Sequence, residues 1–394
     1  MEKGDNNMRI IVAPDSFKGS LTAAEAAAGI ELGVKKVFPQ AETITIPLAD
    51  GGEGTVSALV SATGGHIISK EVTGPLGERV RAQFGILGDG KTAVVEMASA
   101  SGLPLVPPEK RNPLLTTTYG TGELIRAALN EGCRRIIIGI GGSATNDGGA
   151  GMAQALGIKL TDSNGKDISF GARGLSRLAH IDVSTLDTRF TEVEVLVACD
   201  VDNPLIGPKG AAAVYGPQKG ADPQMIKDLD LILQRFAVII HRDLRMDIMD
   251  IPGAGAAGGL GAGLLAFLKA KLVPGVQLIL EAGNMEDILR KGANLVITGE
   301  GAINRQTVYG KTPIGVAKLA QKYDIPVIAI VGSMEPGAEI VYSQGIDAVM
   351  PITPGPISLA EAMERAEELM PAAAERAMRL LMVGLSLSQP TKQT

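Results

Sequence analysis

Several short apolar runs of the chain are each followed at once by a polar, glycine-rich turn that carries a carboxylate. The runs have the composition of buried strands, and they cover residues 9–13, 43–49, 135–140, 193–198 and 294–298. The residues of interest after them are Asp15, Ser16 and Lys18; Asp50; Gly141, Gly142, Ser143, Asn146 and Asp147; Asp200 and Asn203; and Glu300, Asn304, Gln306 and Lys311. Ligands bind outside the carboxyl ends of strands in open parallel sheets. If the runs belong to two facing sheets, these carboxylates converge in a cleft.

Carboxylates, glycines and a few lysines, without a histidine cluster, favour phosphoryl transfer. Carboxylates bind Mg²⁺, usually with waters retained, and glycine lets backbone N–H groups approach phosphate oxygens. Lysine neutralises charge on the transferred group, and an Asp can accept the proton of the attacking hydroxyl. The three histidines, His66, His180 and His241, lie apart and outside these turns. We interpret them as ordinary surface or core residues.

The shorter motifs are weak by themselves. Residues 139–144 match the loose GxGxxA dinucleotide pattern and residues 253–258 match GxGxxG, but such matches arise by chance in a chain with 50 glycines. Residues 310–312 have the ending of a P-loop, yet Arg305 stands where its first glycine belongs. Lys311 still precedes a predicted helix N-terminus, which is a suitable place to bind phosphate.

Each carboxylate also has a structural alternative. Asp commonly caps helices and braces turns, and for Asp15, Asp50 or Asp147 taken singly this role is about as well supported as a functional one. The repetition of such turns after so many strand-like runs weakens a purely structural account of all of them.

The composition excludes several classes of protein. The 394 residues carry a formal net charge of −6, whereas general nucleic-acid binding needs a basic surface. Two cysteines cannot form a disulfide framework or a Cys-rich zinc site. Because the first residues also lack the features of a signal peptide, we expect a cytoplasmic location. Residues 251–268 are uncharged but mostly Gly and Ala, so we expect a buried loop and helix there, not a membrane span.

The order of predicted elements favours an α/β fold. A strand at 9–13, a helix with capping-box residues Thr22 and Glu25, and a strand at 43–48 form a βαβ unit, which is typical of a parallel sheet. The same rhythm returns after residue 294 with two further strands and a helix that begins with Pro313 at its first position.

The remaining segments are less regular. Residues 72–97 suggest antiparallel hairpins. Residues 202–222 are rich in Gly and Pro, and irregular loops of this length are usually functional or mobile. From Ser358 we expect a long helix with a second capping box that kinks at Pro371. The polar residues after 385 are expected to form a mobile tail.

At these turns the sequence resembles the glycerate kinase family, whose members phosphorylate D-glycerate at its 2-hydroxyl. The resemblance runs from near residue 8 to beyond residue 350, and long matches in order are far more specific than any short pattern above. The matching stretches are APDSFKGSL (13–21), PLADGGEGT (47–55), VTGPLGE (72–78), GIGGSATNDGGAGMAQALG (139–157), ACDVDNPLIG (198–207), GAGAAGGLGAG (253–263), LVITGEG (295–301) and GKTPIGVA (310–317).

The resemblance implies ATP as co-substrate, Mg²⁺ as cofactor and two α/β domains with the active site in a cleft between them. One domain is a flavodoxin-like or Rossmann-like three-layer domain built from both chain ends, which we place at residues 8–67 and 290–385. The other is a mixed α/β domain at 68–289, and residues 1–7 and 386–394 are expected to be mobile tails. No nucleic-acid or membrane partner is expected, and a homodimer is left open.

Roles for the individual residues are a hypothesis built on these turns. Asp200 is our choice for the base that takes the proton of the 2-hydroxyl, with Asp50 in reserve, and Lys18 completes the catalytic set. The substrate-binding residues are Asp15, Ser16, Lys18, Asn203 and Gln306. The ATP phosphates are assigned to Gly141, Gly142, Ser143, Asn146 and Lys311, and Mg²⁺ to Asp50, Glu300 and Asp147.

Two positions depart from the family pattern. After TGEG the family usually has a basic residue, an apolar residue and Asp, whereas this chain has Ala302, Ile303 and Asn304. Asn cannot act as a base and binds Mg²⁺ more weakly than a carboxylate. Two alternatives therefore stand beside the kinase: a catalytically impaired protein that binds glycerate or nucleotide, and a nicotinamide-dependent hydroxy-acid oxidoreductase that rests on the GxGxxA match alone.

Overall fold

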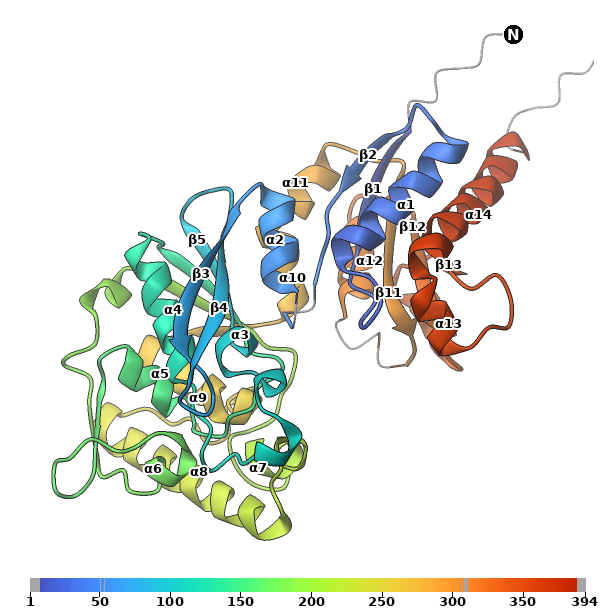
Figure 1. The fold of residues 1–394 in the computed structure, drawn as a ribbon. Coiled ribbons are helices and arrows are strands. Elements are labelled where there is room, and N and C mark those ends of the chain that lie inside the picture. Colours follow the sequence, from blue (N-terminus) through green and yellow to red (C-terminus); the bar gives the residue numbers. More distant parts are fainter. Residues whose placement is uncertain (1–7, 50, 53, 306, 308–310, 388–394) are drawn as a thin grey trace, which may run out of the picture. The chain divides into compact units, whose positions relative to one another are not determined.

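The structure, a computed structural model, describes residues 8–49, 51–52, 54–305, 307 and 311–387. The chain divides into two compact units (Figure 1), one formed by residues 1–50 with 279–394 and the other by residues 51–278. We call them the N/C unit and the middle unit. The sequence-based boundaries, 67/68 and 289/290, lie further along the chain. The difference at the first boundary arises because α2 (Thr55–Thr63) packs on strands β4 and β5 of the middle unit.

The N/C unit is built on a parallel five-stranded sheet with the order β13-β12-β11-β1-β2. The strands are β1 (Arg9–Pro14), β2 (Glu42–Thr45), β11 (Leu295–Ile303), β12 (Val327–Met334) and β13 (Ala348–Pro351). Counted within this unit, the spatial order is 2-1-3-4-5, the flavodoxin-like order, in which the chain reverses direction across the sheet between the first and third strands. Here that switch point lies between β1 and β11. The predicted α/β fold is therefore confirmed.

Helices cover both faces of this sheet. The helices are α1 (Ala23–Val37), α11 (Met285–Arg290), α12 (Thr312–Gln321), α13 (Leu359–Glu364) and α14 (Ala366–Leu387), with a 3₁₀ helix at Ala338–Gln344. Ile10, Val12 and Ile297 share one apolar cluster with α1 and α14. The alternate residues Ile11 and Val296 are fully buried as well, which is typical of a parallel strand covered on both faces.

Helix α1 packs closely against α14. Gly33 makes this approach feasible, because a Cβ atom at this position would lie 2.4 Å from the carbonyl oxygen of Pro371 and 2.5 Å from the Cβ of Ala374. At the start of α1, Thr22 and Glu25 form the predicted capping box. Both ends of the chain are thus tied into one hydrophobic core.

The C-terminal helices differ from the sequence-based prediction. The Ser358 hydroxyl accepts the N–H of Glu361 as expected. Helix α13 then ends at Glu364, and Arg365 separates it from α14. The prediction of one helix kinked at Pro371 is therefore wrong. Pro371 lies instead in the second turn of the separate helix α14. That helix continues to Leu387, so the first residues of the expected tail are helical, and residues 1–7 and 388–394 lie outside the described part of the chain.

The middle unit has a mixed six-stranded sheet with the order β10-β9-β6-β5-β4-β3. Strands β5, β6, β9 and β10 are parallel, whereas β3, β4 and β5 pair as the predicted antiparallel hairpins. The strands are β3 (His66–Thr73), β4 (Arg79–Ile86), β5 (Thr92–Glu96), β6 (Arg135–Gly139), β9 (Glu194–Ala198) and β10 (Lys271–Val273), and a small separate sheet pairs β7 (Lys159–Thr161) with β8 (His180–Asp182).

The helices of the middle unit surround this sheet and one large core cluster. After α2 they are α3 (Ala98–Ser101), α4 (Tyr119–Asn130), α5 (Ala150–Ala155), α6 (Gly171–Leu175), α7 (Ala211–Tyr215), α8 (Pro223–Leu244), α9 (Ala256–Leu268) and α10 (Gly275–Ala282), the last of which crosses the unit boundary. Short 3₁₀ turns lie at Leu103–Leu105, Pro108–Lys110, Thr188–Thr191 and Pro217–Lys219.

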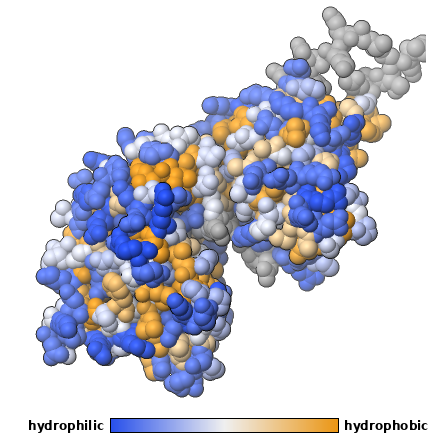
Figure 2. Space-filling model, viewed as in Figure 1, coloured by the Kyte–Doolittle hydropathy of each residue, from blue (hydrophilic) through white to orange (hydrophobic). Residues whose placement is uncertain are grey.

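Two glycine-rich stretches of the middle unit contain regular secondary structure. Residues 251–268 form a turn and helix α9, almost entirely buried, as predicted. Residues 202–222 are more regular than an irregular loop, because α7 and the turn Pro217–Lys219 lie within them. None of the described helices combines the length and the apolar character needed to cross a membrane. Figure 2 shows a largely hydrophilic N/C unit on the visible face, with apolar residues gathered mainly on the middle unit.

Candidate functional site

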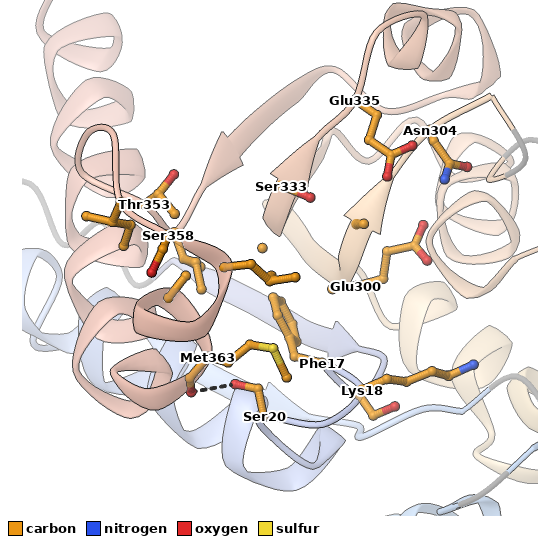
Figure 3. Close-up of a pocket in the computed structure, with 18 of the residues that line it drawn as sticks. Phe17, Lys18, Ser20, Glu300, Asn304, Ser333, Glu335, Thr353, Ser358 and Met363 are labelled. Atoms are coloured by element: carbon orange, nitrogen blue, oxygen red, sulfur yellow. Dashed lines mark hydrogen bonds between the residues drawn. The ribbon is translucent and has the colours of Figure 1, made fainter.

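The N/C unit contains a cavity of about 870 Å³ at the carboxyl ends of its strands (Figure 3). The segment after β1 contributes Asp15 to Lys18, and the end of β11 contributes Glu300 to Asn304. Strand β12 and the segment after β13 supply the rest of the wall. The volume lies within the range of about 300–1,000 Å³ that small-molecule sites occupy. The position at the β1/β11 switch point is where open α/β sheets bind ligands.

Two largely buried carboxylates line this cavity, and the exposed Glu335 is a third carboxylate on its wall. Asp15 is 7% exposed and Glu300 8% exposed. Pro14 pairs with Gly299 in the parallel ladder, and the N–H of Asp15 donates to the carbonyl of Gly299 at 2.8 Å. The two carboxylates therefore follow paired positions on adjacent strands. Sheet register, rather than nearness in sequence, brings them together.

Each of these carboxylates is oriented by neighbouring donors. The Lys311 ammonium lies 3.0 Å from Glu300 Oε2, and the Thr307 hydroxyl donates to Oε1 at 2.9 Å. Asp15 accepts the Thr312 hydroxyl at 2.7 Å and the N–H of Ser16 at 2.6 Å. Burial raises the pKa of Glu300, while Lys311 and the hydrogen bonds act in the opposite direction. The cavity therefore holds one carboxylate, Glu300, that is costly to keep ionised unless a cation is near.

The cavity gathers five of the residues that the sequence singled out, together with the divergent residues Ala302 and Asn304. The five are Asp15, Ser16, Lys18, Glu300 and Lys311. Asn304 donates its backbone N–H to Thr307 at 3.1 Å, so it belongs to the same network as Glu300. Asp50 and Gln306 lie outside the described residues, and their assigned roles stay predictions.

Sequence reasoning missed one side of this cavity. Ser333 and Glu335 line it from the end of β12, and residues 352–363 line it beyond β13. A signal was present, because the apolar run 325–331 is followed by Gly332 and Ser333 in the same way as the strands that we did select. The Gly- and Pro-containing stretch 353–356 before α13 is a second such signal.

The other predicted residues lie in the middle unit. The turns after β6 and β9 meet the turn before α2, because a Cβ atom at Gly139 would lie 2.5 Å from the carbonyl oxygen of Gly51, and one at Gly51 would lie 2.8 Å from the Cβ of Ala198. Gly141 and Gly142 are exposed beside this meeting point. Asp200 follows β9 and accepts the N–H of Gly275, the first residue of α10, at 2.8 Å. The structure therefore brings these turns together within the middle unit.

Asp147 is fully buried and its carboxylate is used by the protein itself. One oxygen accepts from the N–H and hydroxyl of Thr118 and from the N–H of Gly151, and the other accepts from the N–H of Gly149. Burial raises its pKa, and these hydrogen bonds oppose the rise. The contacts brace the starts of α4 and α5, so the structural alternative fits Asp147 and a ligand role for Mg²⁺ does not.

The other predicted binding residues of the middle unit differ in what holds them. Ser143 is 7% exposed and Asn146 is fully buried, and among the described residues the Asn146 side-chain amide has no hydrogen-bond partner. Asn203 accepts the Tyr215 hydroxyl at 2.6 Å and donates to the carbonyl of Lys209 at 2.8 Å, which fixes the segment around α7. Asn203 is therefore a residue that braces its own loop.

Lys219 is a buried lysine that the sequence did not reveal. Its side chain is 1% exposed and donates to the carbonyl of Thr145 at 2.7 Å. Burial lowers its pKa to about 7, with Asp147 acting in the opposite direction. Because a lysine in a Gly- and Pro-rich stretch is usually exposed, only the folded structure shows this environment.

The donor set of the N/C cavity suits Mg²⁺. Mg²⁺ is usually held by one or two carboxylates together with water and substrate phosphates, and Asp15 and Glu300 supply that number of carboxylates. Across the described part of the chain, no three His, Cys, Asp or Glu side chains cluster closely enough to hold a metal ion by themselves.

Comparisons with known proteins identify the family of the chain. The model of the Glycerate kinase family matches residues 10–382. This chain belongs to the glycerate kinase family. The protein named glycerate kinase of Bacillus subtilis strain 168 is 58% identical over 382 residues, which are 97% of this chain and 99% of that protein. The protein named glycerate 2-kinase of Escherichia coli K12 is 52% identical over 378 residues, 96% of this chain and 99% of that one.

A solved structure has the same fold as this family member. It comes from Salmonella typhimurium LT2 and carries the designation glycerate kinase 2. It superposes with a TM-score of 0.88 at 51% identity and covers 96% of this chain and 100% of its own. The resemblance that the sequence motifs suggested is thereby confirmed at the level of the family.

We predict that Glu300→Gln makes the N/C unit more stable near neutral pH. A carboxyl group whose pKa is higher in the folded chain binds more protons there, so stability falls as the pH rises from the unfolded pKa through the folded one. Gln does not ionise, so it removes this loss of stability at higher pH, and its side-chain oxygen can still accept the Thr307 hydroxyl. Lys311 loses its ion pair, but its side chain is 37% exposed and water can solvate its charge. Thermal unfolding midpoints at about pH 7.5 and about pH 4.5 test the sign, and the advantage of the variant should be larger at the higher pH.

Glu335→Gln is the matched control, because Glu335 lines the same cavity but is exposed. We expect it to change the midpoint little at either pH. A Glu300→Gln midpoint at or below that of the unmodified protein near neutral pH would contradict the prediction.

Proposed function

We propose that this protein transfers the γ-phosphoryl group of ATP to the 2-hydroxyl of D-glycerate, in the presence of Mg²⁺, and forms 2-phospho-D-glycerate and ADP. The observation that carries the proposal is the cavity at the β1/β11 switch point, where Asp15, Lys18, Glu300 and Lys311 meet. The relatives named glycerate kinase, 52–58% identical along nearly the whole chain, supply the acceptor substrate. The choice of the 2-hydroxyl rests on the name of the Escherichia coli relative.

In this proposal the polar end of the cavity receives the polyphosphate. Lys18 and Lys311 supply positive charge toward the phosphate oxygens, and fixed charges of this kind are the main source of catalysis in phosphoryl transfer. Asp15 and Glu300 would hold Mg²⁺, which when bound neutralises charge on the phosphates. Lys311 also precedes helix α12, whose N-terminal end favours anions.

The acceptor hydroxyl needs a base. Asp200 is our choice, as the sequence suggested, and its contact with the N–H of Gly275 fixes the orientation of its carboxylate. In the reaction the O2 atom of glycerate forms a bond to the γ-phosphorus, the bond from that phosphorus to the β,γ-bridging oxygen breaks, and ADP leaves with the electron pair. The hydroxyl proton goes to Asp200. Lys18 is exposed, and we assign it the additional role of meeting the glycerate carboxylate.

The direct test is incubation of the purified protein with Mg-ATP and D-glycerate, followed by phosphorus NMR. We expect one new phosphomonoester signal, that of 2-phospho-D-glycerate, and an equal amount of ADP. Formation of the 3-phospho isomer would correct the position of transfer. No phosphorylated product, with ATP intact, would overturn the proposal.

A nicotinamide-dependent oxidoreductase has less support from the structure. The dinucleotide fingerprint requires a helix that opens directly from its glycine turn, whereas the GxGxxA match at 139–144 is followed by more irregular residues before α5 begins at Ala150. Thermal protection distinguishes the two activities, because Mg-ATP should raise the unfolding midpoint and NADH or NADPH should not.

Asp200→Asn tests the choice of base. Asn keeps an oxygen that can accept the N–H of Gly275, so the start of α10 is retained while the basic group is lost. We expect kcat to fall by about 10²–10⁴-fold, the usual contribution of a general base, with little change in unfolding midpoint. The exposed neighbour Asp202 provides the control Asp202→Asn, which should keep kcat near its original value. A near-normal kcat for Asp200→Asn would remove Asp200 from this role.

A second candidate function, an impaired member of the family that binds its ligands without efficient transfer, is favoured by Asn304. At position 304 the family pattern has Asp. Asn304 lines the cavity and is joined through Thr307 to Glu300. We predict that Asn304→Asp raises kcat, because a further carboxylate strengthens the binding of Mg²⁺ at this end. Steady-state turnover over a Mg²⁺ titration measures the effect.

The outcome separates the two candidates. An unchanged kcat would show that position 304 does not supply a key carboxylate. Binding of Mg-ATP and D-glycerate without transfer, in both the unmodified protein and Asn304→Asp, would favour a protein that binds glycerate and nucleotide without acting on them.

A further inference from the structure

The cavity of the N/C unit has two chemically different ends. Figure 3 shows Lys18, Glu300 and Asn304 toward one end, and Thr353, Ser358 and Met363 toward the other, with Phe17 between them. The second end is walled mainly by apolar side chains from the segment after β13 and from α13, namely Ile352, Pro356, Ile357, Leu359, Ala362 and Met363. This division is not required by a site for a small polar acid alone.

The size of the cavity points the same way. A three-carbon hydroxy acid with two hydroxyls has almost no apolar surface and fills a small part of 870 Å³. A nucleoside triphosphate, by contrast, has a flat and largely apolar base at one end and a chain of charged phosphates at the other. Small-molecule sites are typically apolar pockets with a few well-placed polar groups, and this cavity has that arrangement along its length.

The apolar end also presents side chains with surface still to bury. Leu359 is 75% exposed although it lines the cavity, and Pro356 is exposed beside it. Phe17 and Ile352 form a buried floor, at 3% exposure each. The Ser20 hydroxyl donates to the carbonyl of Met363 at 3.1 Å, which ties α13 to the turn after β1. A ligand with an apolar face could therefore bury the exposed side chains of Leu359 and Pro356 at this end.

We propose that this apolar end, formed by Phe17 and residues 352–363, is the subsite for the nucleobase of the nucleotide substrate, with the phosphates directed toward Lys18 and Lys311. The assignment rests on the proposed function, since it deepens the role of the same cavity. It places the whole nucleotide in the N/C unit, whereas the sequence had also assigned phosphate contacts to Gly141, Gly142, Ser143 and Asn146 of the middle unit.

Two substitutions change the base subsite and leave the polar end intact. A Cβ atom at Gly355, which lines the cavity, would have no neighbour within 4 Å. Gly355→Phe therefore adds bulk without a clash in the backbone, and the ring is expected to compete with the base. Leu359→Ala removes an exposed apolar contact and should not disturb folding, because Leu359 is 75% exposed.

The chain offers a matched control for each change. Gly384 lies on α14 outside the cavity, and a Cβ atom at this position would also have no neighbour within 4 Å, so Gly384→Phe repeats the first substitution elsewhere. Leu387 is 81% exposed on the same helix, so Leu387→Ala repeats the second. Circular dichroism and unfolding midpoints check that all four variants are folded.

The measurement is isothermal titration calorimetry of each full-length variant with two probes, Mg-ADP and Mg-tripolyphosphate. We expect Gly355→Phe to weaken Mg-ADP binding by at least about tenfold, as a mis-shaped apolar pocket does, and Leu359→Ala to weaken it by at least about threefold. The affinity for Mg-tripolyphosphate, which has no base, should not change in either variant. The control variants should bind both probes as the unmodified protein does.

The outcomes separate the subsite from the function. Mg-ADP binding that is unchanged in both cavity variants overturns the base subsite, and the kinase proposal then still stands or falls on the NMR experiment. Equal losses for Mg-ADP and Mg-tripolyphosphate also overturn it, because the variants would then act on the whole cavity. An unmodified protein that binds neither probe overturns the proposed function and the subsite together. In steady-state kinetics we expect the KM for ATP to rise and the KM for D-glycerate to stay constant.

Discussion

The pairing of β1 with β11 is the constraint on which the candidate site depends. It joins segments 285 residues apart, and the Thr298 hydroxyl donates to the carbonyl of Ala13 within it at 2.8 Å. Parallel register then sets Asp15 beside Glu300. Because parallel strands cannot be joined by a tight turn, the chain must leave the sheet after β2 and return at β11. The whole middle unit, residues 51–278, is part of the chain segment that connects β2 to β11.

This topology also explains why the site residues occur in short separate motifs. The parallel strands of the N/C unit end at the same edge of the sheet, and the segments at the ends of β1, β11, β12 and β13 line one cavity. The polar turns after β1 and β11 supply charge, while the segment after β13 supplies apolar surface. Each short segment already lies at the shared edge of the sheet because it directly follows its strand. Segments of different composition can therefore give one cavity a charged end and an apolar end.

Burial of the Glu300 carboxylate in this cavity disfavours its charged form and so lowers the stability of the fold. Glu300 is almost enclosed, and positive charge reaches its carboxylate from Lys311, at 3.0 Å, and from Lys18. Sites that bind cations and phosphates commonly hold such groups in a state that is less stable without the ligand. Asp147 in the middle unit has a different environment, because four backbone or hydroxyl donors form hydrogen bonds with its carboxylate. Burial of a carboxylate is therefore not by itself a sign of function, and the identity of the donors decides.

The sequence by itself determined the α/β class, the capping box at Thr22 and Glu25, and the segments that carry Asp15, Lys18, Glu300 and Lys311, because these depend on local patterns of apolar and polar residues. It also determined the strands β1, β2, β6, β9, β11 and β12. Its motifs also determined the family. Only the tertiary structure decided which turns share a cavity, because that depends on strand order and register between segments far apart in the chain. It also separated Asp147, whose hydrogen bonds brace two helices, from Glu300, which faces a cavity, although the sequence presents both as acidic residues among glycines after a predicted strand. Burial and donor geometry distinguish the two, and neither can be read from spacing along the chain.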